Sequence, residues 1–261
     1  MKVVLITAVH GRHVIVERML RHHAKVAEQL KDCCELSIVA AMSPEDAPTL
    51  FPVCSQLGII STACTNHPVS RKWQLALSLA KHLLEPDAVI ILGSDDFANE
   101  SYFRQAVNRI KAGSQGCGPD SVWFYSQPSG TMGLWRGPMR LSTVVSATKD
   151  PANRAVTIQH SDLPAGAGRI LSRRLLDAID WQLWNFDRDS ALDTYSSLAI
   201  LNRVHMKLDI LRVDSMPGAA IIDVKNGDNM HDWRDLPFSH VVEPEPAKEL
   251  LRQLDLEVCA G

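Results

Sequence analysis

Two adjacent acidic residues follow a short, strongly apolar run in the first half of the chain. Residues 87–97 read Asp-Ala-Val-Ile-Ile-Leu-Gly-Ser-Asp-Asp-Phe, so Asp95 and Asp96 come two small residues after the run Val89–Leu92. Such a run predicts a strand buried on both faces, and ligands of open α/β sheets bind beyond the carboxyl ends of their strands. Neighbouring carboxylates repel each other unless positive charge lies beside them, and hard divalent cations prefer oxygen ligands. The pair therefore predicts a cation site that holds phosphate oxygens; the structural alternative is an aspartate that caps the next helix.

The elements that lead to these acids alternate between strands and helices. Four short runs predict strands, namely Val3–Thr7, Leu36–Ala41, Gly58–Thr62 and Asp87–Leu92. Apolar residues at three- and four-residue steps predict two helices, His13–Leu30 and Trp73–Leu84. The order β-α-β-β-α-β predicts a mainly parallel sheet with helices on its faces. A dinucleotide-binding Rossmann domain is not indicated, because the first strand lacks GxGxxG and no Walker lysine loop is present.

The second half of the chain has weaker patterns. We expect a helix capped by Asn99 or Ser101 that runs to Lys111, and turns in the glycine-rich residues 112–120. Further strands are predicted at Val122–Tyr125, Gly168–Leu171, Lys207–Val213 and Ala219–Val224, with a hairpin of Thr131–Trp135 and Leu141–Ala147. Further helices are predicted at Ser172–Ile179, Ser190–Arg203 and Pro246–Leu254. No linker or repeat is visible, so we expect one domain over residues 1–261.

The composition is that of a globular protein. Hydrophobic residues make up 46% and charged residues 22% of the 261 residues, and the net charge of −3 gives no overall attraction to nucleic acid or anionic membranes. The 6 cysteines form no CxxC pair, which indicates neither a zinc site nor a disulfide framework and favours reduced thiols in the cytoplasm. The start of the chain is read as a strand, not as a signal peptide, and no apolar run is long enough to span a bilayer.

Four stretches of the chain, taken together, resemble a known family. They are Leu5–Arg12, Asn66–Trp73, Leu92–Asp96, and Gly166–Arg169 continuing to Leu192-Asp193. In this order and spacing they resemble glycosyltransferases of the GT-A fold, closest to the family 2 type. The third stretch resembles the family's DxD-type motif with its first acid replaced by Ser94. The fourth resembles the acceptor-side segment that ends in a catalytic acid, with Leu192-Asp193 where the family has Glu-Asp.

The resemblance implies a GT-A, three-layer α/β/α fold with a mainly parallel central sheet. It implies a nucleotide-binding half, residues 1–97, and an acceptor-side half, residues 98–261. The implied activity is that of a hexosyltransferase, inverting, which moves a sugar from a nucleotide-diphosphate donor to a hydroxyl acceptor with Mn²⁺ or Mg²⁺ as cofactor. The acceptor stays open among a glycan, a lipid-linked sugar, a protein, a small molecule and a modified DNA base.

The implied metal site centres on the adjacent acids. Asp96 is the leading ligand, because a divalent cation stabilises the charge that develops on a leaving diphosphate. Asp95 binds the metal through water or contacts the ribose or sugar of the donor. His231, in the polar residues 225–238, is a third candidate ligand, since neutral imidazole binds such metals. Its structural alternative is a solvated loop histidine.

Eight residues are candidates for contacts with the donor. They are Thr7, Ala8, Val9, Arg12, Ser43, Glu45, Lys72 and Ser94. Arg12 and Lys72 are expected to contact phosphates or base, and the alternative for both is a surface ion pair. The others lie at expected strand ends, where the alternative is ordinary turn chemistry.

The implied general base is a carboxylate in the acceptor-side half. Asp193 matches the family's position best, and Asp189 and Asp187 are the runners-up; a carboxylate within hydrogen-bond reach can take up the acceptor's proton. The structural alternative for Asp193 is a favourable anion in the first turn of a helix. Trp181 and Trp184 are candidates for stacking on a sugar or base, although their spacing is more typical of a core.

Two other functions share parts of this pattern. A nucleotidyltransferase that makes activated sugars has the same layered fold, but its glycine-rich basic loop does not match Ala8–Arg12. A non-catalytic nucleotide- or glycan-binding module is the second alternative. The seven basic residues against two acidic ones in residues 136–174 allow an anionic acceptor, but a solvated charged face explains them more simply.

Overall fold

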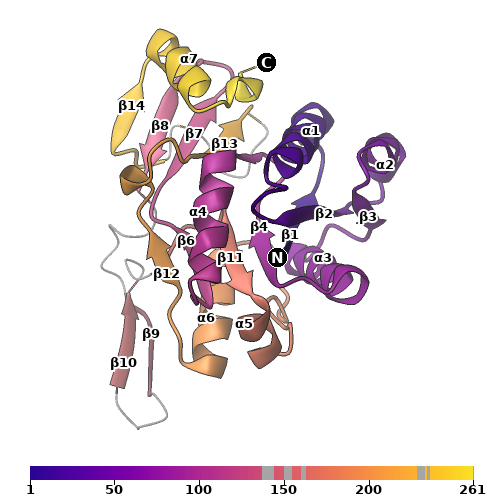
Figure 1. The fold of residues 1–261 in the computed structure, drawn as a ribbon, viewed down its shortest axis with the longest axis vertical. Helices are drawn as coiled ribbons and strands as arrows, with labels where there is room; N and C mark the ends of the chain where they lie inside the picture. Colours follow the sequence, from indigo (N-terminus) through magenta and orange to yellow (C-terminus); the bar gives the residue numbers. More distant parts are fainter. Residues whose placement is uncertain (137–143, 150–154, 160–162, 228–232, 234–235, 261) are drawn as a thin grey trace.

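The computed structural model describes the chain except residues 137–143, 150–154, 160–162, 228–232, 234–235 and 261. Its larger sheet has the strand order β12-β6-β11-β4-β1-β2-β3 (Figure 1). These strands are β1 Lys2–Val9, β2 Glu35–Met42, β3 Ile60–Ala63, β4 Ala88–Ile91, β6 Gly116–Pro119, β11 Arg169–Ser172 and β12 Asp209–Leu211. Strands β1 to β4 run parallel, and β11 lies antiparallel to both β4 and β6. The predicted mainly parallel sheet is therefore confirmed.

Helices cover both faces of this sheet (Figure 1). They are α1 His13–Gln29, α2 Ala47–Gln56, α3 Val69–Leu84, α4 Glu100–Lys111, α5 Arg173–Ala178 and α6 Leu192–Val204. Because side chains alternate along a strand, β1 contributes to two separate cores. Val3 and Leu5 pack with α1, α2 and α4, whereas Val4 and Ile6 pack with α3, α5 and α6. The result is the three-layer α/β/α arrangement that the sequence predicted.

Helix α2 is absent from the sequence prediction, which placed β2 and β3 in direct succession. The structure has the order β-α-β-α-β-α-β instead. Two prolines make this segment look unlike a helix in the sequence, because proline lacks the backbone N–H that a helix interior uses. Pro48 lies in the first turn, where no backbone N–H is needed, and Pro52 lies inside the helix. Ala47, Leu50 and Cys54 form its buried side at the three- and four-residue spacing of a helix.

The glycine-rich residues 112–120 were also predicted wrongly, because their second half is strand β6 and not a turn. Its glycines are needed for close packing. A Cβ atom on Gly116 would lie 2.7 Å from the Leu208 side chain, and one on Gly118 would lie 2.9 Å from the Arg169 side chain. Helix α4, by contrast, begins as predicted, because the Asn99 side chain accepts a hydrogen bond of 3.1 Å from the Tyr102 N–H.

A second sheet, with the order β14-β8-β7-β13-β5, lies beside the first. Its strands are β5 Asp96–Ala98, β7 Val122–Ser126, β8 Met132–Trp135, β13 Ile221–Lys225 and β14 His240–Val242. The predicted hairpin of 131–135 with 141–147 is wrong: β8 pairs with β7 and β14, and β9 Val144–Lys149 pairs with β10 Ala155–Gln159. Helix α7 Pro244–Gln253 and the 3-10 helices Val213–Ser215 and Glu257–Cys259 complete the described elements.

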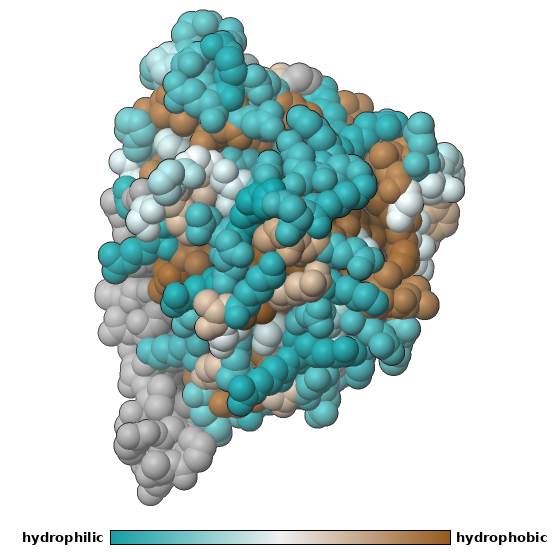
Figure 2. Space-filling model, viewed as in Figure 1, coloured by the Kyte–Doolittle hydropathy of each residue, from teal (hydrophilic) through white to brown (hydrophobic). Residues whose placement is uncertain are grey.

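The surface seen in Figure 2 is mostly hydrophilic. Hydrophobic side chains gather on the right of the view, over α2 and β3, where Phe51 is 38% exposed. Within the described part of the chain, no helix combines the length and the hydropathy needed to cross a membrane.

Candidate functional site

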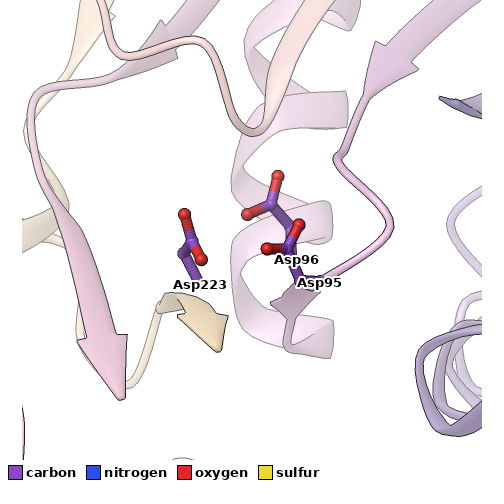
Figure 3. A group of neighbouring side chains, drawn as sticks. All are labelled: Asp95, Asp96 and Asp223. Atoms are coloured by element: carbon purple, nitrogen blue, oxygen red, sulfur yellow. The ribbon is translucent and has the colours of Figure 1, made fainter. Parts of the chain in front are cut away.

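Three carboxyl groups meet where the two sheets join. The chain leaves the large sheet at the end of β4 and enters the second sheet at Asp96, the first residue of β5. Strand β13 runs antiparallel to β5 and places Asp223 directly opposite Asp96. One carboxylate oxygen from each of Asp95, Asp96 and Asp223 lies within 4.8 Å of the others (Figure 3). We call these three residues the acidic cluster.

The turn that presents the cluster requires a glycine. Asp96 Oδ2 accepts a hydrogen bond of 2.6 Å from the Gly93 N–H. A Cβ atom on Gly93 would lie 2.9 Å from that same oxygen, closer than a carbon atom can approach without displacing it. The small residue between strand and acids, seen in the sequence only as the end of an apolar run, thus holds the Asp96 carboxylate in place.

Two cations lie against the acidic cluster. Arg12 donates from Nη1 to Asp95 Oδ2 at 2.6 Å and from Nη2 to Ser94 Oγ at 3.1 Å. Lys225 Nζ lies 2.8 Å from each carboxylate oxygen of Asp223 and 4.0 Å from Asp95 Oδ2. Among the residues that the structure describes, the group therefore has three acids against two bases.

Burial and mutual repulsion raise the pKa values of two acids in this group. Burial, followed by repulsion from Asp223 and Asp95, raises the pKa of Asp96 well above its ordinary value. Burial and then Asp95 raise the pKa of Asp223 to about 7. Burial alone would lower the pKa of Lys225, but attraction by Asp223 and Asp95 outweighs it and raises that pKa. A divalent cation would favour the ionised form of the acids, and their oxygens are the hard ligands that Mg²⁺ and Mn²⁺ prefer. The cluster therefore fits such a cation.

The acidic cluster opens into a cavity of about 490 Å³, the acidic pocket. Its polar lining includes the cluster, Arg12, Lys225 and Asp193, and its apolar lining includes Trp73, Trp135 and Trp184. Asp193 lies in the first turn of α6 and is exposed. The structure thus brings the predicted base and the predicted metal ligands to one cavity, although they are far apart in the sequence.

Gly166 and Arg169 fix the position of Asp193. A Cβ atom on Gly166 would lie 2.2 Å from the Asp193 carboxyl group, so a larger residue there would displace this side chain. The buried guanidinium of Arg169 donates to the Asp193 carbonyl oxygen at 2.7 Å, to Ser196 Oγ at 3.1 Å and to the Pro164 carbonyl oxygen at 2.7 Å. This one side chain therefore joins the start of α6 to the loop that carries Gly166.

A second cavity of about 410 Å³, the β1 pocket, lies at the carboxyl end of β1 and shares Arg12 and Trp73 with the acidic pocket. Of the residues predicted to contact a donor, it is lined by Ala8, Val9, Arg12, Lys72 and Ser94. Residues that the prediction did not include also line it, among them His10, Asn66 and His67. Most of the predicted donor contacts therefore share one cavity.

Asp189 lies in the β1 pocket and not beside Asp193. Its Oδ1 accepts hydrogen bonds from the Val69 N–H at 2.8 Å and from His67 Nδ1 at 3.1 Å. These two bonds, the backbone one first, lower the pKa of Asp189. Asp189 thus accepts a hydrogen bond from the backbone at the start of α3. The two candidate bases, Asp189 and Asp193, line different cavities. Asp187, the other runner-up, forms a bidentate ion pair with Arg71 at 2.8 Å.

The remaining predicted donor contacts, Thr7, Ser43 and Glu45, do not line the β1 pocket. Thr7 is buried in β1, and its Oγ1 has no hydrogen-bond partner among the described residues. Ser43 is buried and bonded to His10 Nδ1 at 3.0 Å, whereas Glu45 is exposed and lies 3.4 Å from the same nitrogen. His231, the predicted third metal ligand, lies outside the described residues.

Asp223 and Lys225 are the residues that sequence reasoning missed. They lie two apart in an otherwise apolar strand, and side chains two apart point to the same face. Two charges on one face of a buried strand are the signal that could have identified them. Of the two predicted stacking residues, Trp181 is buried with its Nε1–H bonded to Asp177 at 2.7 Å, and Trp184 lines the acidic pocket.

Comparison with solved structures places this geometry among known folds. The structure of S. aureus TarS residues 1–349 aligns with 98% of this chain at a TM-score of 0.55 and 16% identity, and the chain covers 65% of it. The same protein in complex with UDP-GlcNAc gives a TM-score of 0.57 at 17% identity, with 98% of this chain and 66% of that one covered. This chain therefore spans slightly less than two thirds of the length of these structures. No model of a protein family matches the sequence, and no curated protein matches it. At this identity the likeness concerns the fold alone, and it confirms the predicted α/β fold of the GT-A type.

Proposed function

We propose that the protein is a metal-dependent glycosyltransferase that moves a sugar from a nucleotide-diphosphate donor to a hydroxyl acceptor with inversion at the anomeric carbon. The observation that carries this proposal is the acidic pocket, where the acidic cluster and Asp193 line one cavity of a GT-A fold. The related fold of TarS, solved with UDP-GlcNAc, supports a nucleotide sugar as the donor.

Asp96 and Asp223 are the principal ligands that we propose for Mn²⁺ or Mg²⁺, with Asp95 beside them. Their oxygens already lie within 4.8 Å of one another, which brings the three carboxyl groups within reach of a single cation. Bound there, the cation supplies Lewis-acid stabilisation of the charge on the leaving diphosphate. Arg12, which lines both cavities, is in a position to contact the donor phosphates, because its guanidinium already lies at the edge of the cluster.

The β1 pocket is the proposed site of the nucleoside. Ala8 and Val9 contribute to its wall at the end of β1, and the aromatic ring of Trp73 lies where the two cavities meet. A nucleoside in this pocket would direct its diphosphate towards Arg12 and the acidic cluster. This arrangement agrees with the rule that ligands of open α/β sheets bind outside the carboxyl ends of the strands.

Asp193 is the proposed general base for the acceptor hydroxyl. It is exposed to the acidic pocket, its backbone is held by Arg169, and its carboxyl group packs against Gly166. A carboxylate in such a position takes the proton as the hydroxyl attacks the anomeric carbon. Direct attack by the acceptor gives inversion, which is why one base suffices.

The test is a panel of nucleoside-diphosphate sugars with purified protein, with Mn²⁺ and with EDTA. We expect the melting temperature to rise with the cognate donor and Mn²⁺, because a ligand that binds only the folded state stabilises it. We also expect slow donor hydrolysis that releases a nucleoside diphosphate. Release of pyrophosphate from a nucleoside triphosphate would identify a nucleotidyltransferase instead. Binding without any turnover would indicate a binding module.

A further inference from the structure

Two consecutive buried histidines of α1 bind both backbone groups of one residue in β5. His22 Nε2 lies 2.9 Å from the Ala98 carbonyl oxygen, and the Ala98 N–H donates to His23 Nε2 at 3.2 Å. His22 is 8% exposed and His23 is fully buried. Ala98 is the last residue of the short strand whose first residue is Asp96.

These two bonds fix opposite tautomers. A carbonyl oxygen only accepts, so His22 must carry its hydrogen on Nε2; the Ala98 N–H only donates, so His23 must have an unprotonated Nε2. The hydrogen of neutral His23 is therefore on Nδ1, and this atom is buried with no partner among the described residues. Leaving a buried donor unpaired is unfavourable, so a residue that does so needs a compensating role. An apolar side chain would fill the same space without this penalty.

The role follows from the position of β5 at the edge of the second sheet. Within the described strands, β5 pairs only with β13, and it is three residues long. The imidazoles form hydrogen bonds with the N–H and C=O groups of Ala98, which would otherwise be available to pair with a further strand. The ring of Phe97 also packs against both of them, with centroids 5.7 Å from His22 and 6.5 Å from His23. Helix α1 therefore closes the free edge of β5 on the side away from Asp223.

We propose that His22 and His23 are positioning residues for the acidic cluster, which fix β5 against β13 and so keep Asp96 opposite Asp223. The inference rests on the proposed function in one respect, namely that the cluster binds a divalent cation. Neither histidine lines the acidic pocket. Their effect on the metal passes through the backbone of β5, and the residues that support metal ligands in this way commonly change metal affinity when they are replaced.

The experiment measures Mn²⁺ affinity in the absence of nucleotide, by electron paramagnetic resonance of the free ion. Three variants of α1 are compared with wild type: His23→Leu, His23→Gln and Val26→Ala. Leucine removes the acceptor for the Ala98 N–H, glutamine keeps an acceptor oxygen, and Val26, buried one turn away, controls for a general loss of stability. We expect His23→Leu to weaken Mn²⁺ binding about tenfold or more, and glutamine to restore most of it. Val26→Ala should lower the melting temperature without changing the affinity.

Two structural measurements complement the affinities, and the first needs only wild-type protein, so the inference is testable even if a variant does not fold. In wild-type protein, ¹⁵N spectra of the imidazoles should show the hydrogen on Nε2 of His22 and on Nδ1 of His23. In folded His23→Leu or His22→Leu, the amides of residues 96–98 should exchange with solvent faster than in wild type. A protonated Nε2 on His23 would overturn the inference.

The two proposals fail in different ways. Wild-type protein that binds no Mn²⁺ would overturn the metal site and this inference with it. Wild-type protein that binds Mn²⁺, beside a folded His23→Leu variant of equal affinity, would overturn the positioning role alone and leave the proposed function intact.

Discussion

The two cavities that meet at Arg12 and Trp73 each contain a buried lysine, and the two lysines behave in opposite ways. Lys225, in the acidic pocket, lies 2.8 Å from Asp223, and the neighbouring acids raise its pKa. Lys72, in the β1 pocket, is 1% exposed, and burial lowers its pKa. The same residue type is held by ionised partners in one cavity and by neutral partners in the other.

The partners of Lys72 explain the difference. Its ammonium group donates to the Val9 carbonyl oxygen, to Ser43 Oγ and to Asn66 Oδ1, each at 2.7 Å. An ammonium group has three hydrogens, so these bonds use all of them inside the protein. The sequence predicted that Lys72 contacts the donor, and this contact stays a prediction. The geometry gives Lys72 the role of joining the ends of β1 and β2 to the loop before α3, which shapes the β1 pocket.

The acidic pocket is organised around charge, and the β1 pocket is organised around hydrogen bonds. In the first, the described residues place three carboxyl groups against two cations, Arg12 and Lys225. In the second, polar groups such as those of Lys72, Ser43 and Asp189 bond to each other or to backbone. Changes in the first pocket should therefore act on metal and turnover, and changes in the second on stability and nucleoside binding.

The largest expected effect comes from Asp96→Asn in the acidic pocket. The amide keeps the shape of the side chain but removes the charge that a divalent cation requires. Loss of stabilisation worth several kcal/mol corresponds to a fall in kcat of at least about a thousandfold. Turnover of the cognate donor with Mn²⁺ is the measurement.

The melting temperature of Asp96→Asn without metal should not fall, because the variant also loses the repulsion from Asp223 and Asp95. A variant with near-native turnover would remove Asp96 from the metal site.

The second effect separates the two candidate bases, one in each pocket. Asp193→Asn should reduce sugar transfer by about a hundredfold or more, the usual share of general-base catalysis, and should leave donor affinity nearly unchanged. Asp189→Asn should keep catalysis close to wild type and lower the melting temperature, because Asp189 binds the Val69 N–H and His67. Transfer assays and thermal melts of both variants provide the measurements. If Asp189→Asn abolishes transfer while Asp193→Asn does not, the base is in the β1 pocket and the assignment is wrong.

How far the sequence predicted these features depended on whether their cause was local. The strands β1 and β4 were predicted, and the cap of α4 was narrowed to Asn99 or Ser101, because an apolar run or a single capping side chain suffices to identify such features. Strand β6 was not, because its glycines make sense only beside Leu208 and Arg169, which are distant in the sequence.

The same distinction holds for the acidic cluster. Asp95 and Asp96 were found because they directly follow a buried strand. Asp223 was not, because it joins them only through the register of β13 against β5. Strand register between distant segments depends on tertiary packing, which local propensity and periodicity do not record.

The third effect compares the lysines directly, with Lys72→Met and Lys225→Met. Methionine fills much of the volume of lysine without its charge. Lys72→Met leaves three acceptors, two of them in buried residues, without their donor. We therefore expect the free energy of unfolding to fall by about 3 kcal/mol while Mn²⁺ affinity without nucleotide stays unchanged. Lys225→Met removes a cation that competes with the metal, so Mn²⁺ should bind about tenfold more tightly. Chemical denaturation and Mn²⁺ titration of both variants test the pair. The comparison fails if Lys72→Met changes Mn²⁺ affinity as much as Lys225→Met does.

The smallest effect is a pH dependence that belongs to the acidic pocket alone. Burial and Asp95 raise the pKa of Asp223 to about 7 in the folded protein, from an ordinary value of 3.8. The folded state therefore binds the proton more tightly than the unfolded state does. The stability that this proton contributes is complete below pH 3.8 and is lost as the pH rises through about 7.

In EDTA, Asp223→Asn should therefore gain stability relative to wild type between pH 5 and pH 8, because an amide does not ionise. The gain corresponds to roughly 1.4 kcal/mol for each unit of pKa shift, reduced by the relaxation of neighbouring charges. Urea denaturation of both proteins at the two pH values gives the difference. Saturating Mn²⁺ should diminish it, because a bound cation favours the ionised acids in wild type. A difference between variant and wild type that stays constant from pH 5 to pH 8 would mean that Asp223 does not titrate in this range, which would contradict a pKa of about 7 for this carboxyl group.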